Sequence, residues 1–395
     1  MAEQFKYAVV GAGRQGTAAA YDMVLHGGAS SVLLADYDGA VARQAAERIN
    51  RLVGREVASH AQLDVRDYDA LVTLLEPIDV YLCAVPYKFI MGCTQAAIHA
   101  KTHMVDLGGH TDTVLKQMQL DEVAKERGIS IVPDCGMGPG LNNTMGLYTV
   151  EQLAARGAAP REVRIWDGGL PVDPPPPWGY QASFHINGLT NEYSGKAVFL
   201  RDGKITLVET FTEFEILEFE GLGKLEAFVA SGGTSTVPYN YEGQLQVYEN
   251  KICRYPGHFA QFRAFKDLGL FNEEPVDVIP GKVRISPREF YHALLGPQIE
   301  VDQVVDICVM RAEGIGSLDG QDIAMVIDIV DGFDEPTGFN GMERLTGWHA
   351  AIMCEFIARG EVEPGAWAME KAVTSTRFME KIRERGFKVT ERWEA

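Results

Sequence analysis

Three glycines and one acid near the start of the chain have the spacing of a phosphate-binding turn. Gly11, Gly13 and Gly16 form the pattern Gly-x-Gly-x-x-Gly directly after the apolar run 7–10, and Asp36 follows about twenty residues after Gly16. Glycines here let the backbone approach a pyrophosphate, and the free N–H groups at the start of the next helix favour an anion. A carboxylate at this spacing accepts hydrogen bonds from a ribose. The pattern predicts a dinucleotide site, with a glycine turn that binds nothing as the alternative.

The acid at position 36 also predicts which dinucleotide binds. A carboxylate accepts hydrogen bonds from two ribose hydroxyls but repels a 2′-phosphate, Asp38 adds negative charge, and no arginine follows directly. NAD is therefore expected in preference to NADP. The residues expected to contact it are Gly11, Gly13, Arg14, Gln15, Gly16, Asp36, Asp64, Ala84, Val85 and Pro86.

A second set of polar side chains follows later apolar runs, where buried strands are expected to end. Tyr87 follows the run 79–85, Asp106 and His110 flank the Gly108-Gly109 turn, and Asp134 follows the run 129–132. Ligands of open α/β sheets bind at the carboxyl ends of the strands. We therefore expect catalytic roles for Asp106, His110 and Tyr87, and substrate contact for Asp134. In the alternative interpretation, His110, Asp106 and Asp134 only cap or stabilise local turns.

The middle of the chain offers candidates for substrate recognition. The stretch Gly232-Gly233-Thr234-Ser235 supplies backbone N–H groups and two hydroxyls that suit a carboxylate. Arg254 has the geometry to pair with a carboxylate through two hydrogen bonds. We expect Thr234, Ser235, Arg254 and His258 to contact substrate, with Glu226 a lesser candidate. The alternatives are an ordinary strand-end turn and a surface ion pair. Cys135 is expected to be a small core residue rather than a nucleophile.

Composition narrows the class of protein. The chain has 395 residues, of which 46% are hydrophobic and 23% charged, and its formal net charge is −19. This balance is typical of a globular protein and lacks the basic face of a nucleic-acid binder. Six scattered cysteines, without a paired spacing, favour a reducing cytoplasm, and no signal peptide or membrane span is expected. No histidine or cysteine spacing indicates a metal site.

Strands and helices, which must position these residues, alternate in the first part of the chain. Strands are expected at 8–10, 32–35, 79–85, 103–107 and 129–132, with helices at 40–52 and 115–127. A helix is expected at 142–156, then mostly strands from Phe184 to Arg254, a helix at 286–295, strands at 301–311 and 323–330, and helices at 346–358 and 370–385. We predict an α/β fold: a Rossmann doubly wound parallel sheet with an inserted α+β domain of mixed or antiparallel strands. Residues 1–140 and 345–395 would form the NAD-binding domain, and 141–344 the substrate-binding or dimerisation domain.

Several short motifs occur in an order that resembles one known family. They are Val105-Asp-Leu-Gly-Gly-His110, Pro133-Asp-Cys-Gly-Met-Gly-Pro-Gly140, Gly168-Gly-Leu-Pro171, Ser231-Gly-Gly-Thr-Ser-Thr236 and Arg254-Tyr-Pro-Gly-His258. Together with the N-terminal pattern they resemble the saccharopine dehydrogenase-like family over nearly the whole chain, and most closely its lysine 6-dehydrogenase branch. The match around Asn187, Thr190 and Tyr193 is looser.

The resemblance implies NAD-linked oxidation at a carbon that bears nitrogen. In the lysine 6-dehydrogenase branch, the ε-amino carbon of L-lysine loses a hydride, and the hydrolysed product is an aldehyde that cyclises. The first alternative is a saccharopine or carboxyspermidine-type dehydrogenase, which acts on a secondary amine. An alternative of another class is a non-catalytic NAD-binding sensor. A small-molecule amine or amino acid is the expected partner, no nucleic acid or membrane partner is expected, and a homo-oligomer, as a dimer or larger, is expected.

Overall fold

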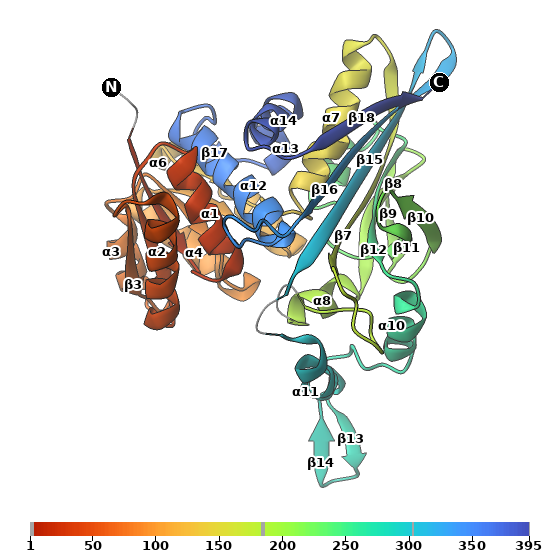
Figure 1. Ribbon diagram of the computed structural model, residues 1–395, viewed down its shortest axis with the longest axis horizontal. Coiled ribbons are helices and arrows are strands. Elements are labelled where there is room, and N and C mark those ends of the chain that lie inside the picture. The colour runs from red at the N-terminus through yellow and green to blue at the C-terminus, as the bar shows by residue number, and fades with distance from the viewer. Residues whose placement is uncertain (1–3, 183–185, 302–303, 395) are drawn as a thin grey trace.

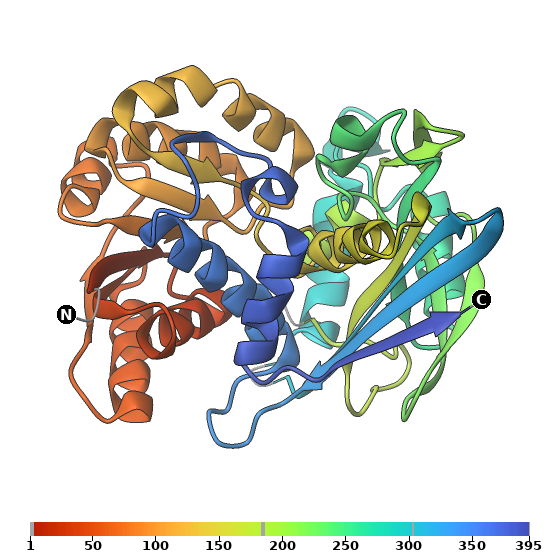
Figure 2. The ribbon, with the colours of Figure 1, turned by 90° about the horizontal axis from the view of Figure 1, so that it is seen from above.

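The protein folds around two large sheets that lie side by side (Figure 1). A computed structural model describes residues 4–182, 186–301 and 304–394. Helices from the last part of the chain, drawn in blue, lie between the two sheets in both views (Figures 1 and 2). No helix within the described ranges is long and apolar enough to cross a membrane.

The first sheet has seven parallel strands in the order β17-β6-β5-β4-β1-β2-β3. Its strands are β1 (Phe5–Val10), β2 (Ala29–Asp36), β3 (Ala58–Gln62), β4 (Val80–Cys83), β5 (His103–Asp106), β6 (Ser130–Val132) and β17 (Gly365–Ala366). The strand order reverses between β1 and β4, which is where a doubly wound sheet binds its ligand. The predicted Rossmann sheet is confirmed.

Helices cover both faces of this sheet because each central strand carries apolar side chains on both sides. In β1, Tyr7 and Val9 join one core cluster, and Ala8 and Val10 join another. The helices of this domain are α1 (Arg14–Leu25), α2 (Gly39–Val53), α3 (Tyr68–Leu75), the 3-10 turn η1 (Tyr87–Phe89), α4 (Ile90–Ala100), α5 (Thr111–Met118) and α6 (Asp121–Arg127). Helix α12 (Gly341–Ala358) returns from the far end of the chain and packs on α1, β4 and β5.

The second sheet is mixed and has nine strands, seven of them in the order β10-β11-β12-β7-β15-β16-β18. These are β7 (Ala159–Pro171), β10 (Glu215–Phe219), β11 (Gly223–Val229), β12 (Val247–Arg254), β15 (Asp306–Leu318), β16 (Gln321–Gly332) and β18 (Val389–Glu394). The other two, β8 (Lys196–Arg201) and β9 (Lys204–Glu209), attach beside β12. Among the described strands of this sheet, only β12 and β7 run parallel and the other pairs are antiparallel, so the predicted mixed domain is confirmed.

The helices of the second domain are short apart from two. They are α7 (Leu141–Ala155), α8 (Ile186–Glu192), α9 (Val237–Tyr241), α10 (His258–Asp267) and α11 (Pro287–Ile299). Helix α7 packs on β7 and β15. A separate hairpin, β13 (Val276–Ile279) with β14 (Val283–Ile285), projects from α11 (Figure 1).

The last segment of the chain contacts both domains. Strand β17 extends the parallel sheet beside β6, whereas β18 pairs with β16 in the mixed sheet. Helices α13 (Met369–Ala372) and α14 (Ser375–Glu384) connect these strands. The division into 1–140 with 345–395 and 141–344 stays a prediction, but the pairing of β18 assigns 389–394 to the mixed sheet.

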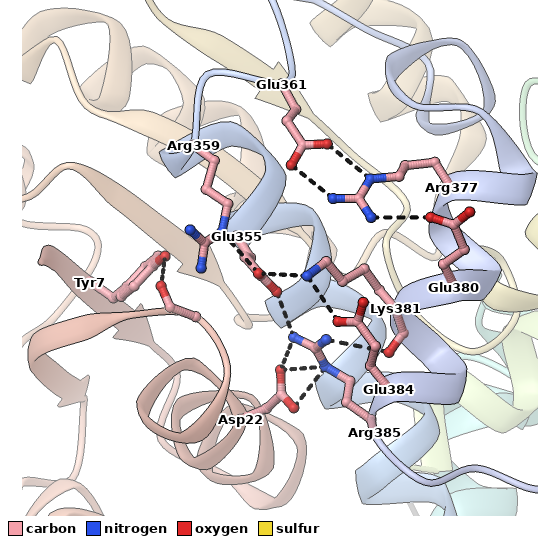
Figure 3. A network of polar contacts seen from close by, with 11 residues as sticks. Tyr7, Asp22, Glu355, Arg359, Glu361, Arg377, Glu380, Lys381, Glu384 and Arg385 are labelled. Atoms are coloured by element: carbon pink, nitrogen blue, oxygen red, sulfur yellow. Dashed lines mark hydrogen bonds and ion pairs between the residues drawn. The ribbon is translucent and has the colours of Figure 1, made fainter. Parts of the chain in front are cut away.

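A buried ion cluster ties this segment to the first domain (Figure 3). Arg385, directly after α14, donates to both carboxylate oxygens of Asp22 on α1, at 2.9 and 3.0 Å. The Nη2 atom of Arg385 lies 2.9 Å from the carboxylate of Glu355 on α12, and the Nζ atom of Lys381 lies 3.1 Å from the same carboxylate. The cluster thus fastens α1, α12 and α14 together.

Several elements differ from the sequence prediction. The helix expected at 115–127 is two helices, α5 and α6, and helices α8 and α9 interrupt the stretch expected to form strands. Phe184, where that stretch was expected to begin, and residues 302–303 of the strand expected at 301–311 lie outside the described residues. Strand β3 was missed because its side chains are mostly exposed, and β17 because two residues carry no periodic pattern.

Candidate active site

The glycine turn has the geometry of a phosphate-binding loop. Gly11 follows β1 with a φ of 104°, and a side chain there would meet the carbonyl of Ala84 at 2.4 Å. At Gly16 a Cβ atom would lie 2.0 Å from the carbonyl oxygen of Gly11, so the first turn of α1 packs directly against the loop. Helix α1 begins after Gly13 without a side-chain cap, which leaves its first N–H groups for a bound anion. Arg14, Gln15 and Gly16 form that first turn.

Asp36 ends β2 beside this turn, as the sequence predicts. Its carboxylate accepts hydrogen bonds from the backbone N–H of Ala12 at 2.9 Å and of Asp38 at 3.0 Å. The fold also brings a cation to this region. The Arg66 guanidinium bonds both oxygens of Asp64 and lies 5.8 Å from the ring of Tyr37. Arg66 is not evident as a neighbour of Asp36 from the sequence, because thirty residues separate the two.

Tyr87 and His110 meet at the ends of β4 and β5. Their rings stack with centroids 4.7 Å apart and planes only 8° from parallel. The Nδ1 atom of His110 lies 2.9 Å from the hydroxyl of Thr113 and accepts from the Thr113 N–H at 3.3 Å. His110 thus caps helix α5, which was the alternative interpretation, and only its Nε2 atom is left for chemistry. Ala84, Val85 and Pro86 connect β4 to Tyr87, and the Ala84 N–H bonds the Val10 carbonyl.

Two buried carboxylates lie at neighbouring strand ends. Asp106 accepts from the side chain of Gln117 at 2.7 Å and from the N–H groups of Gly108 and Asp134 at 2.8 and 3.2 Å. Asp134 accepts from the N–H of Gly109 at 3.1 Å. Burial raises the pKa of Asp106 to about 6. Burial, and then the charge of Asp106, raise the pKa of Asp134 to about 7. The pair is therefore able to exchange a proton near neutral pH.

The 231–236 loop of the second domain reaches this acid pair. The hydroxyl of Ser235 donates a short hydrogen bond to Asp134, so the predicted residues Asp134 and Ser235 lie together across the domain junction. The hydroxyl of Thr234 instead donates to the carbonyl of Val198 at 2.7 Å. Thr234 therefore contributes to holding the loop through this bond.

Arg254 and His258 lie in an inner aromatic cluster. Arg254 is 2% exposed and donates to the Tyr193 hydroxyl at 2.9 Å and the Cys253 carbonyl at 3.0 Å, with Glu192 at 3.4 Å. His258 bonds the same Tyr193 hydroxyl at 2.7 Å. Burial and the Arg254 charge hold the pKa of His258 well below its usual range. Within the residues that the structure describes, no hydrogen bond joins this pair to Asp106 or Asp134.

Sequence reasoning missed a third buried acid, Asp167 on β7. The side-chain amides of Asn142 and Asn250 each donate to it at 3.0 Å. Burial raises its pKa to about 6 despite these bonds. Asp167 continues the alternation of Val163 and Ile165 on a buried face, so a polar residue at an apolar strand position was the signal available.

Other chemical roles find little support in the geometry. The thiol of Cys135 is buried, and burial raises its pKa, which disfavours a nucleophile. Among the described residues, no group of three histidine, cysteine or acidic side chains is placed to hold a metal ion. Glu226 accepts from the N–H groups of Gly257 and Phe259, both at 2.8 Å, and so fixes the start of α10.

Two family models together match most of the chain. The family model described as the saccharopine dehydrogenase NADP binding domain matches residues 7–132, and the saccharopine dehydrogenase C-terminal domain matches 136–387. A saccharopine dehydrogenase (NADP(+), L-glutamate-forming) from Pyricularia oryzae is 28% identical over 233 residues, which cover 56% of this chain and 50% of that protein. The mitochondrial alpha-aminoadipic semialdehyde synthase of Rattus norvegicus is 24% identical over 213 residues, 52% of this chain and 23% of that protein. The match thus spans half or less of these relatives' length.

A solved structure shares the complete fold. Apo saccharopine dehydrogenase (L-Glu forming) from Saccharomyces cerevisiae superposes with a TM-score of 0.78, covering 99% of this chain and 100% of that chain. Its sequence identity of 18% makes this a statement about fold alone.

Proposed function

Because the chain belongs to the saccharopine dehydrogenase family, we propose that it is an NAD-dependent dehydrogenase that oxidises the ε-amino carbon of L-lysine or of a close relative. The carbon loses a hydride to NAD⁺, the nitrogen loses a proton, and water replaces the nitrogen as ammonia. The aldehyde that results cyclises with the α-amine. The observation that carries this proposal is the buried acid pair Asp106 and Asp134, met by Ser235 from the other domain.

We assign the role of general base to Asp134. A primary ammonium is charged at neutral pH and must lose a proton before its carbon gives up a hydride. Asp134, with a pKa of about 7, is matched to that task and accepts two hydrogen bonds within the described residues, from Ser235 and Gly109. Asp106 accepts three, so fewer of its lone pairs are left for substrate. This exchanges the roles expected for the two acids from the sequence.

Charge in the buried interior favours an amine over a polyanion. Asp106 and Asp134, together with the buried Asp167, stabilise the positive charge that develops at the oxidised nitrogen. When bound, the oxidised nicotinamide supplies the hydride acceptor. Arg254 is a buried cation, and three of its five N–H groups are already engaged by Tyr193, Cys253 and Glu192. A substrate with two or three carboxylates would find few free cationic partners here.

The choice of NAD rests on Asp36, whose carboxylate stands beside the glycine turn where a ribose would lie. Two facts favour the alternative of NADP: the matching family model is described as NADP binding, and Arg66 approaches the same region. Arg66 is held by Asp64, however, so its charge is already compensated.

The secondary-amine alternative is favoured by the names of the curated relatives. One experiment distinguishes oxidation of a primary amine from oxidation of a secondary amine. The protein is incubated with NAD or NADP and with L-lysine, ornithine, simple diamines or saccharopine, and the reduced nicotinamide is followed by absorbance. Oxidation of a primary amine also releases ammonia, whereas a secondary amine releases an amino acid. Reduction with lysine and stoichiometric ammonia supports the proposal; reduction with saccharopine alone contradicts it.

The non-catalytic sensor gives a different result in the same assay. It binds nucleotide in a calorimetric titration but reduces it with none of the amines. A failure to bind either nucleotide would contradict both interpretations.

A further inference from the structure

We propose that Glu370 is a positioning residue that acts through Thr236 to direct the Ser235 hydroxyl at Asp134. The inference rests on the proposed function, because it assigns a role to a residue that supports the same acid pair. Glu370 lies on α13, well over two hundred residues from Asp134 along the chain.

The contacts of Glu370 are specific and buried. Glu370 is 9% exposed, and the single proton of the Thr236 hydroxyl is shared between its two carboxylate oxygens, at 2.8 and 3.0 Å. The side-chain amide of Asn240, at the other end of α9, donates to it at 2.7 Å. A buried carboxylate that contacts both Thr236 and Asn240 fixes this short segment in place.

The two acids that hold the Ser235-Thr236 pair come from neighbouring strands. Asp134 follows β6 and Glu370 follows β17, and these strands pair in parallel. Ser235 donates to the first acid and Thr236 to the second. The hydroxyls of Ser235 and Thr236 therefore fasten the loop to two neighbouring segments of the first domain. Ser235 has a φ of 47°, a left-handed conformation that a serine adopts only when its surroundings enforce it.

The backbone of the loop has its own separate anchor. The side-chain amides of Asn142 and Asn143 donate to the carbonyl of Gly233 at 3.0 and 3.1 Å. A Cβ atom at Gly233 would lie 2.0 Å from the side-chain oxygen of Asn250, so the loop presses closely onto β12. Loss of the hydrogen bond between Thr236 and Glu370 should therefore free the Ser235-Thr236 part of the loop, while the bonds to Gly233 keep the rest of the loop folded.

The orientation of Ser235 matters because of the charges around Asp134. Burial raises the pKa of Asp134 most, and the charges of Asp106 at the end of β5 and Glu370 on α13 raise it further. The Ser235 hydroxyl and the Gly109 N–H oppose this by bonding the charged form. If Ser235 turns away, Asp134 holds its proton to a higher pH.

The test compares two substitutions of Thr236 with a matched control. Thr236→Val keeps the shape and removes the hydroxyl, whereas Thr236→Ser keeps the hydroxyl. The control is Thr149→Val, because Thr149 is equally buried and its hydroxyl bonds only Gly146 of its own helix, at 2.6 Å. In Thr236→Val we expect kcat/KM for the amine to fall about tenfold. We also expect the acidic limb of its pH profile to move to higher pH, with an unchanged KM for the nucleotide. Thr236→Ser and Thr149→Val should keep the wild-type profile.

Ser235→Ala completes a double-mutant cycle. Because Thr236 acts through Ser235, the double variant should be no worse than Ser235→Ala alone. Independent losses that multiply, or a wild-type pH profile in Thr236→Val, would overturn the positioning role.

Unfolding measured against pH gives a readout that needs no turnover. The folded pKa of Asp134 lies above its ordinary value, so its contribution to stability is complete at low pH and is lost as pH rises through about 7. In Thr236→Val this loss should continue to higher pH, and in Thr236→Ser it should not. If no amine is oxidised, the proposed function fails while these curves still decide the role of Glu370.

Discussion

The backbone N–H of Asp134 donates to the carboxylate of Asp106 at 3.2 Å, which joins the two acids that end neighbouring strands of the parallel sheet. Both carboxylates are buried, and the pKa values of about 6 and 7 place their titration in the physiological range. Proton transfer at the site therefore depends on how the ends of β5 and β6 are positioned.

Amine oxidation should rise with pH as Asp134 loses its proton. We expect kcat/KM to increase between about pH 6 and 8, and Asp134→Asn to lower it by about 10² to 10⁴. The exposed Asp112 on α5 provides the control, since Asp112→Asn removes an acid from the same domain without touching the pair. Equal losses in the two variants would argue against Asp134 as the base.

The glycine turn allows nucleotide binding to be separated from folding. Gly13 has an ordinary φ of −68°, and a Cβ atom there would meet nothing within 4 Å. We expect Gly13→Ala to fold with the wild-type melting temperature but to bind nucleotide at least about tenfold more weakly, since the methyl group occupies the approach of the pyrophosphate.

Gly16→Ala should both lower the melting temperature and weaken nucleotide binding, because the added Cβ atom would lie 2.0 Å from the Gly11 carbonyl oxygen. Calorimetric titration and thermal unfolding measure the two properties. Undiminished binding in Gly13→Ala would place the dinucleotide elsewhere.

Removal of the charge at position 36 should shift the nucleotide preference. The N–H groups of Ala12 and Asp38 bond different oxygens of Asp36, so Asp36→Asn keeps one of these two acceptors, and it no longer repels a 2′-phosphate. The ratio of the KM values for NADP and NAD should fall about tenfold. Asp112→Asn on α5 serves as the control, since it removes an exposed acid from another element of the same domain. A ratio unchanged by Asp36→Asn, or a wild-type enzyme that prefers NADP, would contradict the assignment.

The buried ion cluster should carry much of the attachment between α1 and the C-terminal helices (Figure 3). Arg385→Met leaves Asp22 without its buried partner, and we expect it to lower the free energy of unfolding by about 3–5 kcal/mol. Arg377→Met breaks half-exposed pairs with Glu361 and Glu380 and should cost less than about 1 kcal/mol. Denaturant unfolding measures both. Similar losses would show that burial adds nothing to the Asp22 pair.

Sequence reasoning succeeded where the signal is local. The turn from Gly11 to Gly16, the strands on either side of α1, and Asp36 at a strand end all follow from short-range periodicity and spacing. It failed where distant segments meet. Arg66 reaches the region of Asp36 only through the pairing of β2 with β3, and Glu370 reaches Thr236 only after the chain has returned to the first sheet.

Local signals also left His110 ambiguous. A histidine one residue before a helix suits both a cap and a base, and only the contact with Thr113 shows which nitrogen the cap uses.

The position of α12 has a consequence for synthesis of the chain. Nearly every residue of this helix is buried, and it covers α1, β4 and β5, yet the ribosome makes it only after the entire mixed sheet except β18. The apolar face of the first 140 residues therefore has no cover while the middle of the protein is being translated. Nascent chains should depend on chaperones during this interval, and the two halves should mature together rather than in succession.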